Sequence, residues 1–248
     1  MVQSNPAEHL LSRLSVHNAR LRELSFAPPV HTVYNPWEYA AKPWTQYLRR
    51  YGAHAKEVLF MGMNPGPWGM AQTGIPFGEI AATRDWMGIE APVDTPELQH
   101  PKRPVQGFAC RRSEVSGRRL WGLFAETYRS PEEFFHRHLV INYCPLVFMA
   151  ESGRNITPDK LPVAERRELF GRCDIMLGEA LRAYQPRWVV GVGAFAAQRL
   201  KTVLETGTGL VEPRPTVVQI LHPSPASPMA NRGWATQAAR QLVDAGVW

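Results

Sequence analysis

Cysteine is scarce in this chain of 248 residues, which contains only Cys110, Cys144 and Cys173. Three scattered cysteines cannot form a disulfide framework, and by themselves they cannot supply a four-cysteine zinc site or iron–sulfur cluster. Long apolar runs are also absent. None approaches the ~20 residues that a membrane-spanning helix needs, and the N-terminal segment lacks the apolar stretch of a signal peptide. We therefore expect a reduced, intracellular protein with no metal site and no membrane partner.

Several common catalytic motifs are missing as well. There is no G-x-S-x-G, no G-x-x-x-x-G-K-[ST] and no H-E-x-x-H, so the usual serine-hydrolase, P-loop and metalloprotease sites are not indicated. His136 and His138 offer two metal ligands, but no acidic or cysteine partner stands at ligand spacing. Gly191 and Gly193 fit a G-x-G-x-x-A dinucleotide fingerprint, although they follow the third expected strand and close helix–strand packing explains them equally well. We expect no cofactor, with a dinucleotide-dependent enzyme as the alternative.

Positive charge is in excess, with a formal net charge of +6. Many of the basic residues come in pairs: Arg49-Arg50, Lys102-Arg103, Arg111-Arg112, Arg118-Arg119 and Arg166-Arg167. A basic surface attracts polyanions, and its contacts with phosphates make binding sensitive to salt. Charge alone names no partner, but it makes a nucleic acid a candidate.

Unbroken apolar runs alternate with amphipathic stretches from residue 57 to the end of the chain. Runs of this kind are typical of parallel strands covered by helices on both faces, so we predict an α/β protein. We expect one domain, 1–248, in which N-terminal helices at 5–50 pack on an α/β core at 57–245. The expected strands are 57–61, 138–143, 188–192 and 216–221. The expected helices begin at Asn5-Pro6 and Asn35-Pro36 and continue at about 79–87, 116–128, 131–136, 162–184, 194–205 and 231–243.

Polar side chains stand where three of these strands end. Asn64 follows the first strand, Asn142 ends the second, and His222 follows the last. In open parallel sheets the ligand binds at the carboxyl ends of the strands. These three side chains are therefore expected to converge on one site. Each of them alone has a plain structural explanation, because asparagine favours turns and most histidines are structural.

The residues around these strand ends resemble a known family. The motifs are Gly62-Met63-Asn64-Pro65-Gly66-Pro67-Trp68-Gly69-Met70-Ala71-Gln72-Thr73-Gly74, Ser113-Glu114-Val115-Ser116-Gly117, Ser152-Gly153-Arg154-Asn155, Val189-Val190-Gly191-Val192-Gly193 and His222-Pro223-Ser224-Pro225. They resemble the uracil-DNA glycosylase superfamily, and within it the single-strand-selective monofunctional family, from about Tyr34 to Trp234. The resemblance implies a three-layer fold with a central four-stranded parallel sheet flanked by helices. It also implies hydrolysis of the N-glycosidic bond of deoxyuridine, and of some oxidised or deaminated nucleosides, without metal or organic cofactor.

The resemblance also implies two catalytic residues. Asn64 matches the residue that orients the attacking water, and His222 matches the residue that stabilises the departing base. A neutral amide can hold a water by hydrogen bonds, and a neutral imidazole can donate to a developing anion. No lysine stands beside either motif to form a Schiff base, so we expect a monofunctional enzyme that does not cut the strand.

Four further residues match the base pocket of the family. Asn142 matches the amide that reads the uracil edge, and Phe77 matches the ring on which uracil stacks. Met63 and Gly66 match the pocket wall near the C5 position. A small residue at this wall leaves room for a C5 substituent such as hydroxymethyl.

The segment 223–232 corresponds to the loop that pushes into the duplex. Its residues are Pro223, Ser224, Pro225, Ala226, Ser227, Asn231 and Arg232. Prolines make such a loop stiff, and a stiff loop suits extrusion of a nucleotide from its stack. Ala226 and Ser227 are less basic and less bulky than the family pattern, and Trp68 stands where phenylalanine is expected.

The expected partner is single- or double-stranded DNA, bound by a monomer that is located with the DNA. A DNA-binding member of the same fold with weak or no catalysis is the alternative.

Overall fold

Four parallel strands lie at the centre of the protein, in the order β3-β2-β6-β7. They are β2 (Val58–Gly62), β3 (His138–Asn142), β6 (Trp188–Val192) and β7 (Thr216–Ile220). The computed structural model describes residues 5–208 and 212–248. All four strands run the same way, so their carboxyl ends share one edge of the sheet. The α/β fold with a four-stranded parallel sheet, expected from the sequence, is confirmed.

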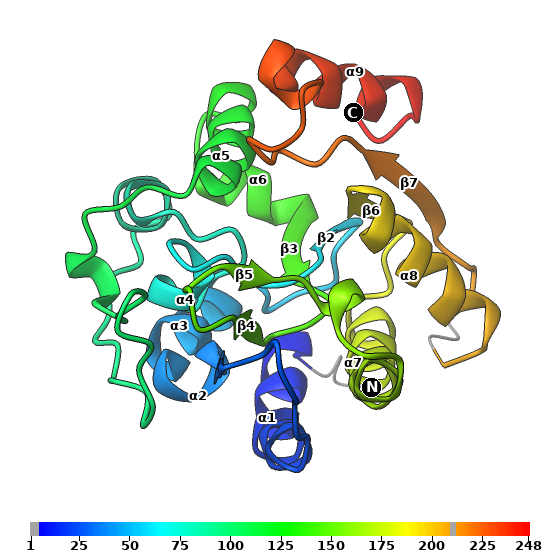
Figure 1. Ribbon diagram of the computed structural model, residues 1–248. Coiled ribbons are helices and arrows are strands. Elements are labelled where there is room, and N and C mark those ends of the chain that lie inside the picture. The colour runs from blue at the N-terminus through cyan, green and yellow to red at the C-terminus, as the bar shows by residue number, and fades with distance from the viewer. Residues whose placement is uncertain (1–4, 209–211) are drawn as a thin grey trace.

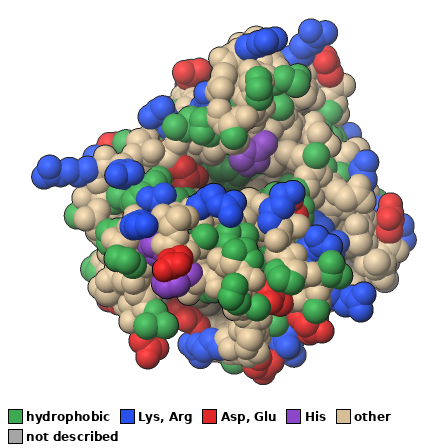
Figure 2. Space-filling view, in the orientation of Figure 1, with side chains coloured by type: hydrophobic (Ala, Val, Ile, Leu, Met, Phe, Trp, Pro, Cys, Tyr) green, Lys and Arg blue, Asp and Glu red, His purple; other side chains and the backbone are tan. Residues whose placement is uncertain are grey.

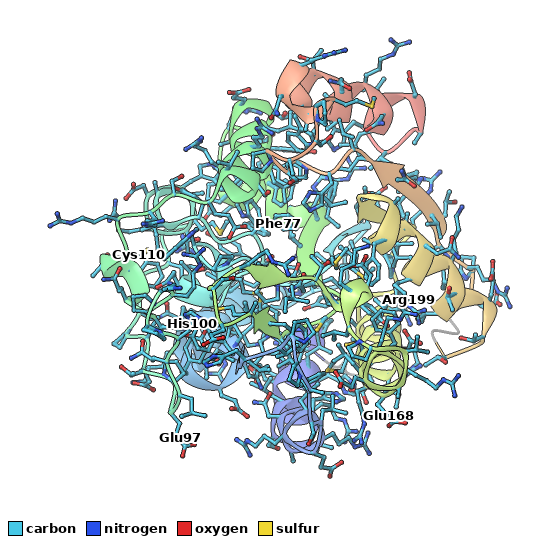
Figure 3. The ribbon with its side chains drawn as sticks, viewed as in Figure 1. Phe77, Glu97, His100, Cys110, Glu168 and Arg199 are labelled. Carbon is cyan, nitrogen blue, oxygen red and sulfur yellow. The ribbon has the colours of Figure 1, made fainter. Side chains whose placement is uncertain are left out.

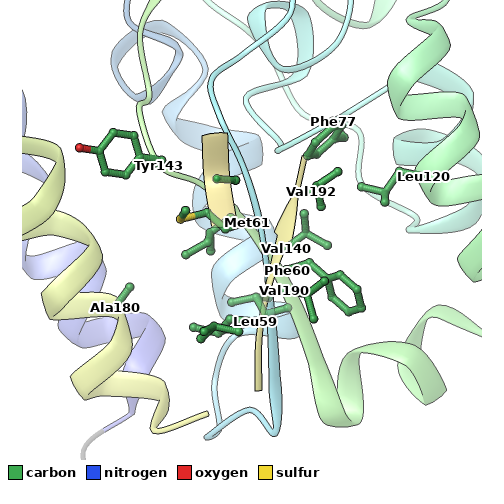
Figure 4. Close-up of a cluster of buried hydrophobic side chains, with 14 of the residues drawn as sticks. Leu59, Phe60, Met61, Phe77, Leu120, Val140, Tyr143, Ala180, Val190 and Val192 are labelled. Atoms are coloured by element: carbon green, nitrogen blue, oxygen red, sulfur yellow. The ribbon is translucent and has the colours of Figure 1, made fainter. Parts of the chain in front are cut away.

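The core is built around the inner strands β2 and β6. Leu59, Phe60 and Met61 of β2 are buried, as are Val190 and Val192 of β6, and side chains from helices on both sides close over them (Figure 4). A strand buried on both faces reads as a continuous apolar run, because neither face can present polar side chains to water. This explains why the inner strands of the central sheet could be predicted from the sequence.

Helices cover both faces of the sheet (Figure 1). In this view α5 (Val115–Thr127), α6 (Pro131–Arg137) and α9 (Trp234–Asp244) lie above it, and α1 (Pro6–Arg22), α3 (Ala41–Tyr51) and α7 (Val163–Tyr184) lie below. The short helices α2 (Pro36–Tyr39) and α4 (Met70–Thr73) lie beside α3, and α8 (Ala194–Glu205) packs on β6 and β7. Within the described ranges, none of the helices combines the length and apolar character needed to cross a lipid bilayer.

The glycines of the dinucleotide-like motif serve helix–strand packing. A Cβ on Gly191 would lie 2.3 Å from the backbone nitrogen of Ala197 on α8, so only glycine lets the helix approach β6 this closely. Gly193 has a φ of +95° and packs against the side chain of His222. Both residues therefore have a complete structural explanation that requires no dinucleotide.

A second, antiparallel sheet was not expected from the sequence. It consists of β1 (Thr32–Tyr34), β4 (Val147–Met149) and β5 (Asn155–Ile156) in the order β1-β4-β5. Strands of two or three residues are too short to show a recognisable alternation of apolar and polar side chains. The sheet matters for function because it brings Leu146 and Asn155 to the carboxyl edge of the central sheet.

Three expected helices differ in the structure, and the one expected at about 79–87 is a short π-helix over Ala82–Trp86. The helix predicted from Asn35-Pro36 to about Arg50 is two helices, α2 and α3, because Ala40 leaves the helical conformation at φ −110° and ψ 31°. The C-terminal helix begins at Trp234 rather than at residue 231, because Gly233 adopts a left-handed conformation with φ of +89°. The preceding residues Ala230–Arg232 form a separate 3-10 turn.

Candidate active site

A cavity of about 510 Å³ opens at the carboxyl edge of the central sheet. This volume lies within the range of small-molecule sites. Five segments supply its walls: the loop after β2, the turn after α4 that carries Phe77, the start of α5, β5 with the residues after it, and the loop after β7. The lining residues are Met63, Asn64, Pro65, Gly66, Pro67, Phe77, Glu114, Ser116, Asn155, Thr157, His222, Ser224 and Pro225. Figure 2 shows this face of the molecule, with a hollow that contains a histidine side chain.

The amide of Asn64 is held in one orientation. Its Nδ2 donates hydrogen bonds to the backbone oxygens of Pro65 at 3.3 Å and Leu146 at 3.2 Å. Both bonds use the donor end of the amide, so Oδ1 remains available to accept a hydrogen bond. The arrangement suits a water molecule that must be oriented rather than strongly activated.

His222 presents a donor from a neutral ring. The backbone N–H of Ser224 donates to its Nδ1 at 3.1 Å, which places the proton of the neutral imidazole on Nε2. Burial lowers the pKa of His222 below its usual value, because the charged form loses hydration. The ring is therefore neutral at physiological pH, and Nε2–H can donate to a group that gains negative charge.

Phe77 lies near the centre of the molecule, on the side of α5 (Figure 3), with its ring centroid 6.2 Å from that of His222. Its φ of +53° is uncommon for a residue with a bulky side chain. Trp121 of α5 holds this backbone by donating from Nε1 to the oxygens of Pro76 and Phe77 at 3.3 and 3.1 Å. Backbone strain of this kind often occurs at functional sites, where surrounding contacts maintain it.

Asn142 lies beside Phe77 but is not among the residues that line the cavity. Gly62 is its partner on β2, and a Cβ on Gly62 would lie 2.4 Å from Asn142 Oδ1 and 2.5 Å from Phe77 Cε2. Nδ2 of Asn142 contacts the sulfur of Met70 at 3.2 Å, while Oδ1 is buried with no hydrogen-bond partner in the described part of the chain. Asn142 lines a narrower neighbouring cavity of about 50 Å³. The structure thus brings Asn64, Phe77 and His222 into one cavity and places Asn142 at its edge.

Glu114 is a site residue whose role the sequence did not indicate. Its carboxyl packs on two glycines of the loop after β2, since a Cβ on Gly66 or Gly69 would lie 2.2 or 2.3 Å from Oε2. Oε2 is buried with no hydrogen-bond partner among the described residues. Burial raises the pKa of Glu114 to about 7; the Gly69 amide opposes this shift and the nearby Glu79 adds to it. Only the position of Glu114 in the Ser113–Gly117 motif hinted at its importance.

The raised pKa of Glu114 predicts a pH-dependent cost to stability. Below pH 4.5 the carboxyl is protonated in both folded and unfolded chains, so it costs nothing. As the pH rises from 4.5 to 7, the carboxyl of Glu114 ionises in the unfolded chain before it ionises in the folded one. The free energy of unfolding therefore falls by about 3 kcal/mol over this range. Glu114→Gln removes this group, so its free energy of unfolding should exceed that of the unsubstituted protein by an amount that grows between pH 4.5 and 7.

Urea unfolding at pH 4.5, 6 and 8 measures this difference. The matched control is Glu205→Gln, at an exposed position at the end of α8, where the carboxylate stays in water in both states. A stability difference for Glu114→Gln that is the same at all three pH values would contradict the prediction.

The loop after His222 is braced from α5. Arg119 donates from Nη1 to the oxygen of Pro223 at 3.1 Å and from Nη2 to Oδ1 of Asn231 at 2.8 Å. Asn231 in turn donates from Nδ2 to the oxygen of Pro225 at 2.9 Å. Ala226 and Arg232 are exposed, and Ser227 is half-buried. The apolar side chain of Met229 is 59% exposed, a feature of this loop that the sequence analysis did not single out.

Comparison with known proteins gives a consistent result. A family model of the uracil DNA glycosylase superfamily matches residues 49–243. Over 230 residues the chain is 49% identical to the single-strand selective monofunctional uracil DNA glycosylase of Bos taurus, covering 93% of this chain and 83% of that protein. The protein of the same name from Mus musculus is also 49% identical, with 93% and 81% covered. The crystal structure of WT Pedobacter heparinus SMUG2 superposes with a TM-score of 0.70 at 16% identity, covering 100% and 98% of the two chains, and this likeness supports the fold.

Proposed function

Because this chain belongs to the uracil-DNA glycosylase superfamily, we propose that its cavity takes up a deoxyuridine flipped out of DNA and that Asn64 and His222 promote hydrolysis of the bond between base and sugar. The protein is a monofunctional uracil-DNA glycosylase of DNA repair. The observation that carries the assignment of the site is the shared cavity: an oriented amide with a free acceptor, a neutral imidazole with a free donor, and an aromatic ring all face it.

The chemistry follows from these groups. The bond between C1′ of the sugar and N1 of uracil breaks, and its electron pair leaves with the base. The sugar gains positive charge and the base gains negative charge, which Nε2–H of His222 stabilises by donating to O2. A water held by Oδ1 of Asn64 adds to C1′ and releases a proton to solvent, and the departing uracil anion takes up a proton from solvent. The products are free uracil and an abasic site in an unbroken strand.

Base recognition would use Phe77 and Asn142. Uracil stacks on the ring of Phe77, and the amide of Asn142 meets its edge. Oδ1, which has no partner among the described residues, accepts from N3–H, and Nδ2 exchanges its weak contact with the sulfur of Met70 for uracil O4. Cytosine would place an amine against Nδ2 and a bare acceptor against Oδ1, so it is rejected as long as the amide keeps its orientation.

Met63 and Gly66 would form the wall next to C5 of the base. Both residues line the cavity, and because position 66 is a glycine, the carboxyl of Glu114 can pack directly against the backbone of this wall. We propose that some oxidised or deaminated bases, including uracil with a C5 hydroxymethyl group, are accepted here. An apolar pocket discriminates only about 10- to 200-fold per methyl-sized group, so rejection of thymine is modest unless polar contacts add to it.

The loop 223–232 is the proposed contact with DNA beside the flipped nucleotide. Three prolines and the brace from Arg119 keep it stiff, and Met229 offers an exposed apolar side chain of the kind that can enter a base stack. Arg232 is exposed and can meet a phosphate. We propose that the protein acts as a monomer on single- and double-stranded DNA, is located with the DNA, and needs no cofactor.

The test is release of uracil from single- and double-stranded oligonucleotides in the presence of EDTA. The expected products are uracil and an abasic strand that breaks only after alkali or heat. Strand cleavage without alkali would contradict a monofunctional mechanism. Binding of the oligonucleotide without any abasic product would favour the alternative, a DNA-binding member of the fold without catalysis.

A further inference from the structure

Trp68 belongs to the loop after β2, which lines the cavity, and its ring contacts two arginines. It follows Pro67, which lines the cavity, and precedes Gly69, which packs on Glu114. The guanidinium carbon of Arg112 is 4.6 Å from the centroid of the indole ring, and that of Arg103 is 5.0 Å away. The three residues come from separate parts of the long segment 62–117, so the fold has assembled one aromatic ring and two positive charges beside the site.

The two charges are not compensated by carboxylates. Within the ranges that the structure describes, neither Arg103 nor Arg112 forms an ion pair. Arg103 donates from Nη1 to the oxygen of Lys102, and its Nε is buried without a partner among the described residues. Arg112 is exposed. A guanidinium that stacks on an aromatic ring keeps the N–H groups at its edge free for another acceptor.

The same holds for the basic residues next to them in the sequence. Between residues 102 and 119, within the described chain, six basic side chains form no ion pair: Lys102, Arg103, Arg111, Arg112, Arg118 and Arg119. Lys and Arg side chains gather along the rim of the hollow in Figure 2. This segment therefore offers six positive charges that no carboxylate neutralises within the described chain.

We propose that Trp68, Arg103 and Arg112 form a platform that binds the phosphate backbone of the DNA strand carrying the target nucleotide. This inference rests on the proposed function and adds the surface that binds the DNA strand on either side of the target nucleotide. Trp68 holds the two guanidiniums in place, so less conformational entropy is lost when they meet phosphates. Arginine edges bind phosphate oxygens in a planar, two-point geometry without reading the sequence of bases.

A second Arg–Trp pair offers a matched control. The guanidinium carbon of Arg187 is 4.0 Å from the ring centroid of Trp188, the first residue of β6. This pair has the same chemistry but lies at the amino end of the strand, opposite the edge that carries the cavity. Arg187→Ala should therefore leave DNA binding and uracil release within about twofold of the unsubstituted protein, as expected of a surface substitution away from the site.

The test measures binding of a fluorescent single-stranded oligonucleotide that contains one stable abasic-site analogue, at 50 to 200 mM salt. Arg112→Ala should reduce the slope of log affinity against log salt by about 0.7, the value for one phosphate contact on a single strand. Trp68→Ala frees both guanidiniums and should weaken binding about tenfold at 100 mM salt, with Trp68→Phe in between. With a uracil substrate the loss should appear mainly in KM.

Two results would end the proposal. One is a salt slope for Arg112→Ala and Trp68→Ala equal to that of Arg187→Ala. The other is a loss confined to kcat, which would mean that Trp68 only shapes the catalytic loop. Arg112 is exposed, so its variant remains informative even if Trp68→Ala does not fold. If the unsubstituted protein releases uracil while the salt slopes of the platform variants are unchanged, only the phosphate-binding platform is refuted. If the unsubstituted protein releases no uracil, the proposed function is refuted.

Discussion

Replacing His222 by alanine is expected to lower the single-turnover rate of uracil release by about 100- to 1000-fold, the loss typical of removing one donor to a developing oxyanion. Nε2–H of the half-buried, neutral ring is the donor that faces the cavity. Since burial already holds the pKa of His222 below its usual value, the ring needs no proton from solvent. Raising the pH above neutrality should therefore not slow the reaction through this group.

The control for His222→Ala is His100→Ala. His100 is a buried histidine whose Nε2 contacts the backbone oxygen of Ala150, and it lies outside the cavity. Its replacement should reduce the melting temperature and leave the rate of uracil release per folded molecule within about threefold. If His222→Ala retains more than a tenth of the rate, stabilisation of the departing base by this side chain is refuted.

Replacing Asn64 by alanine is expected to cost about 100-fold in the same single-turnover assay, near the lower end of the effects seen when a proton-transfer or water-orienting group is lost. The amide can orient a water but cannot accept its proton as a carboxylate would. Binding of the substrate should change little, because Asn64 would contact the water rather than the base. The loss is therefore expected in kcat rather than in KM.

Asn64→Asp sharpens this test. An aspartate at this position would place a carboxylate against the backbone oxygens of Pro65 and Leu146, which now accept hydrogen bonds from Nδ2. Repulsion between these acceptors would disturb the side chain, so Asn64→Asp should also fall well below the unsubstituted rate. Should Asn64→Ala stay within about threefold of that rate, another group must position the water.

Three strands of the central sheet, β2, β3 and β6, could be predicted from the sequence because they are apolar runs buried on both faces. The edge strand β7 has exposed residues at Thr216 and Gln219, but it still contains enough apolar residues to be recognised. The strand expected at 188–192 has those bounds in the structure, and that expected at 57–61 is shifted by one residue. The convergence of Asn64 and His222 also followed, since parallel strands end at one edge. The fold and the family suggested by the motifs are confirmed, whereas the roles of the individual site residues stay predictions.

What could not be predicted depends on contacts between distant segments. Glu114 is an acidic residue in a long loop, and only the folded chain shows that Gly66 and Gly69 bury its carboxyl. The sheet that brings Asn155 to the cavity is made of strands too short to give a pattern. The aromatic–arginine contacts of Trp68 join residues that lie 35 and 44 positions apart, and no local signal in the sequence pairs them.

Helix α5 touches both loops that carry the proposed catalytic side chains. Glu114, at its start, packs on the loop of Asn64, and Arg119, in its second turn, ties down the loop of His222. A local opening that detaches this helix would therefore displace the loop of Asn64 and the loop of His222 together. Amide exchange in the two loops should then occur through one shared opening event. Intermediates in which only one of the two loops is in its native position should be rare.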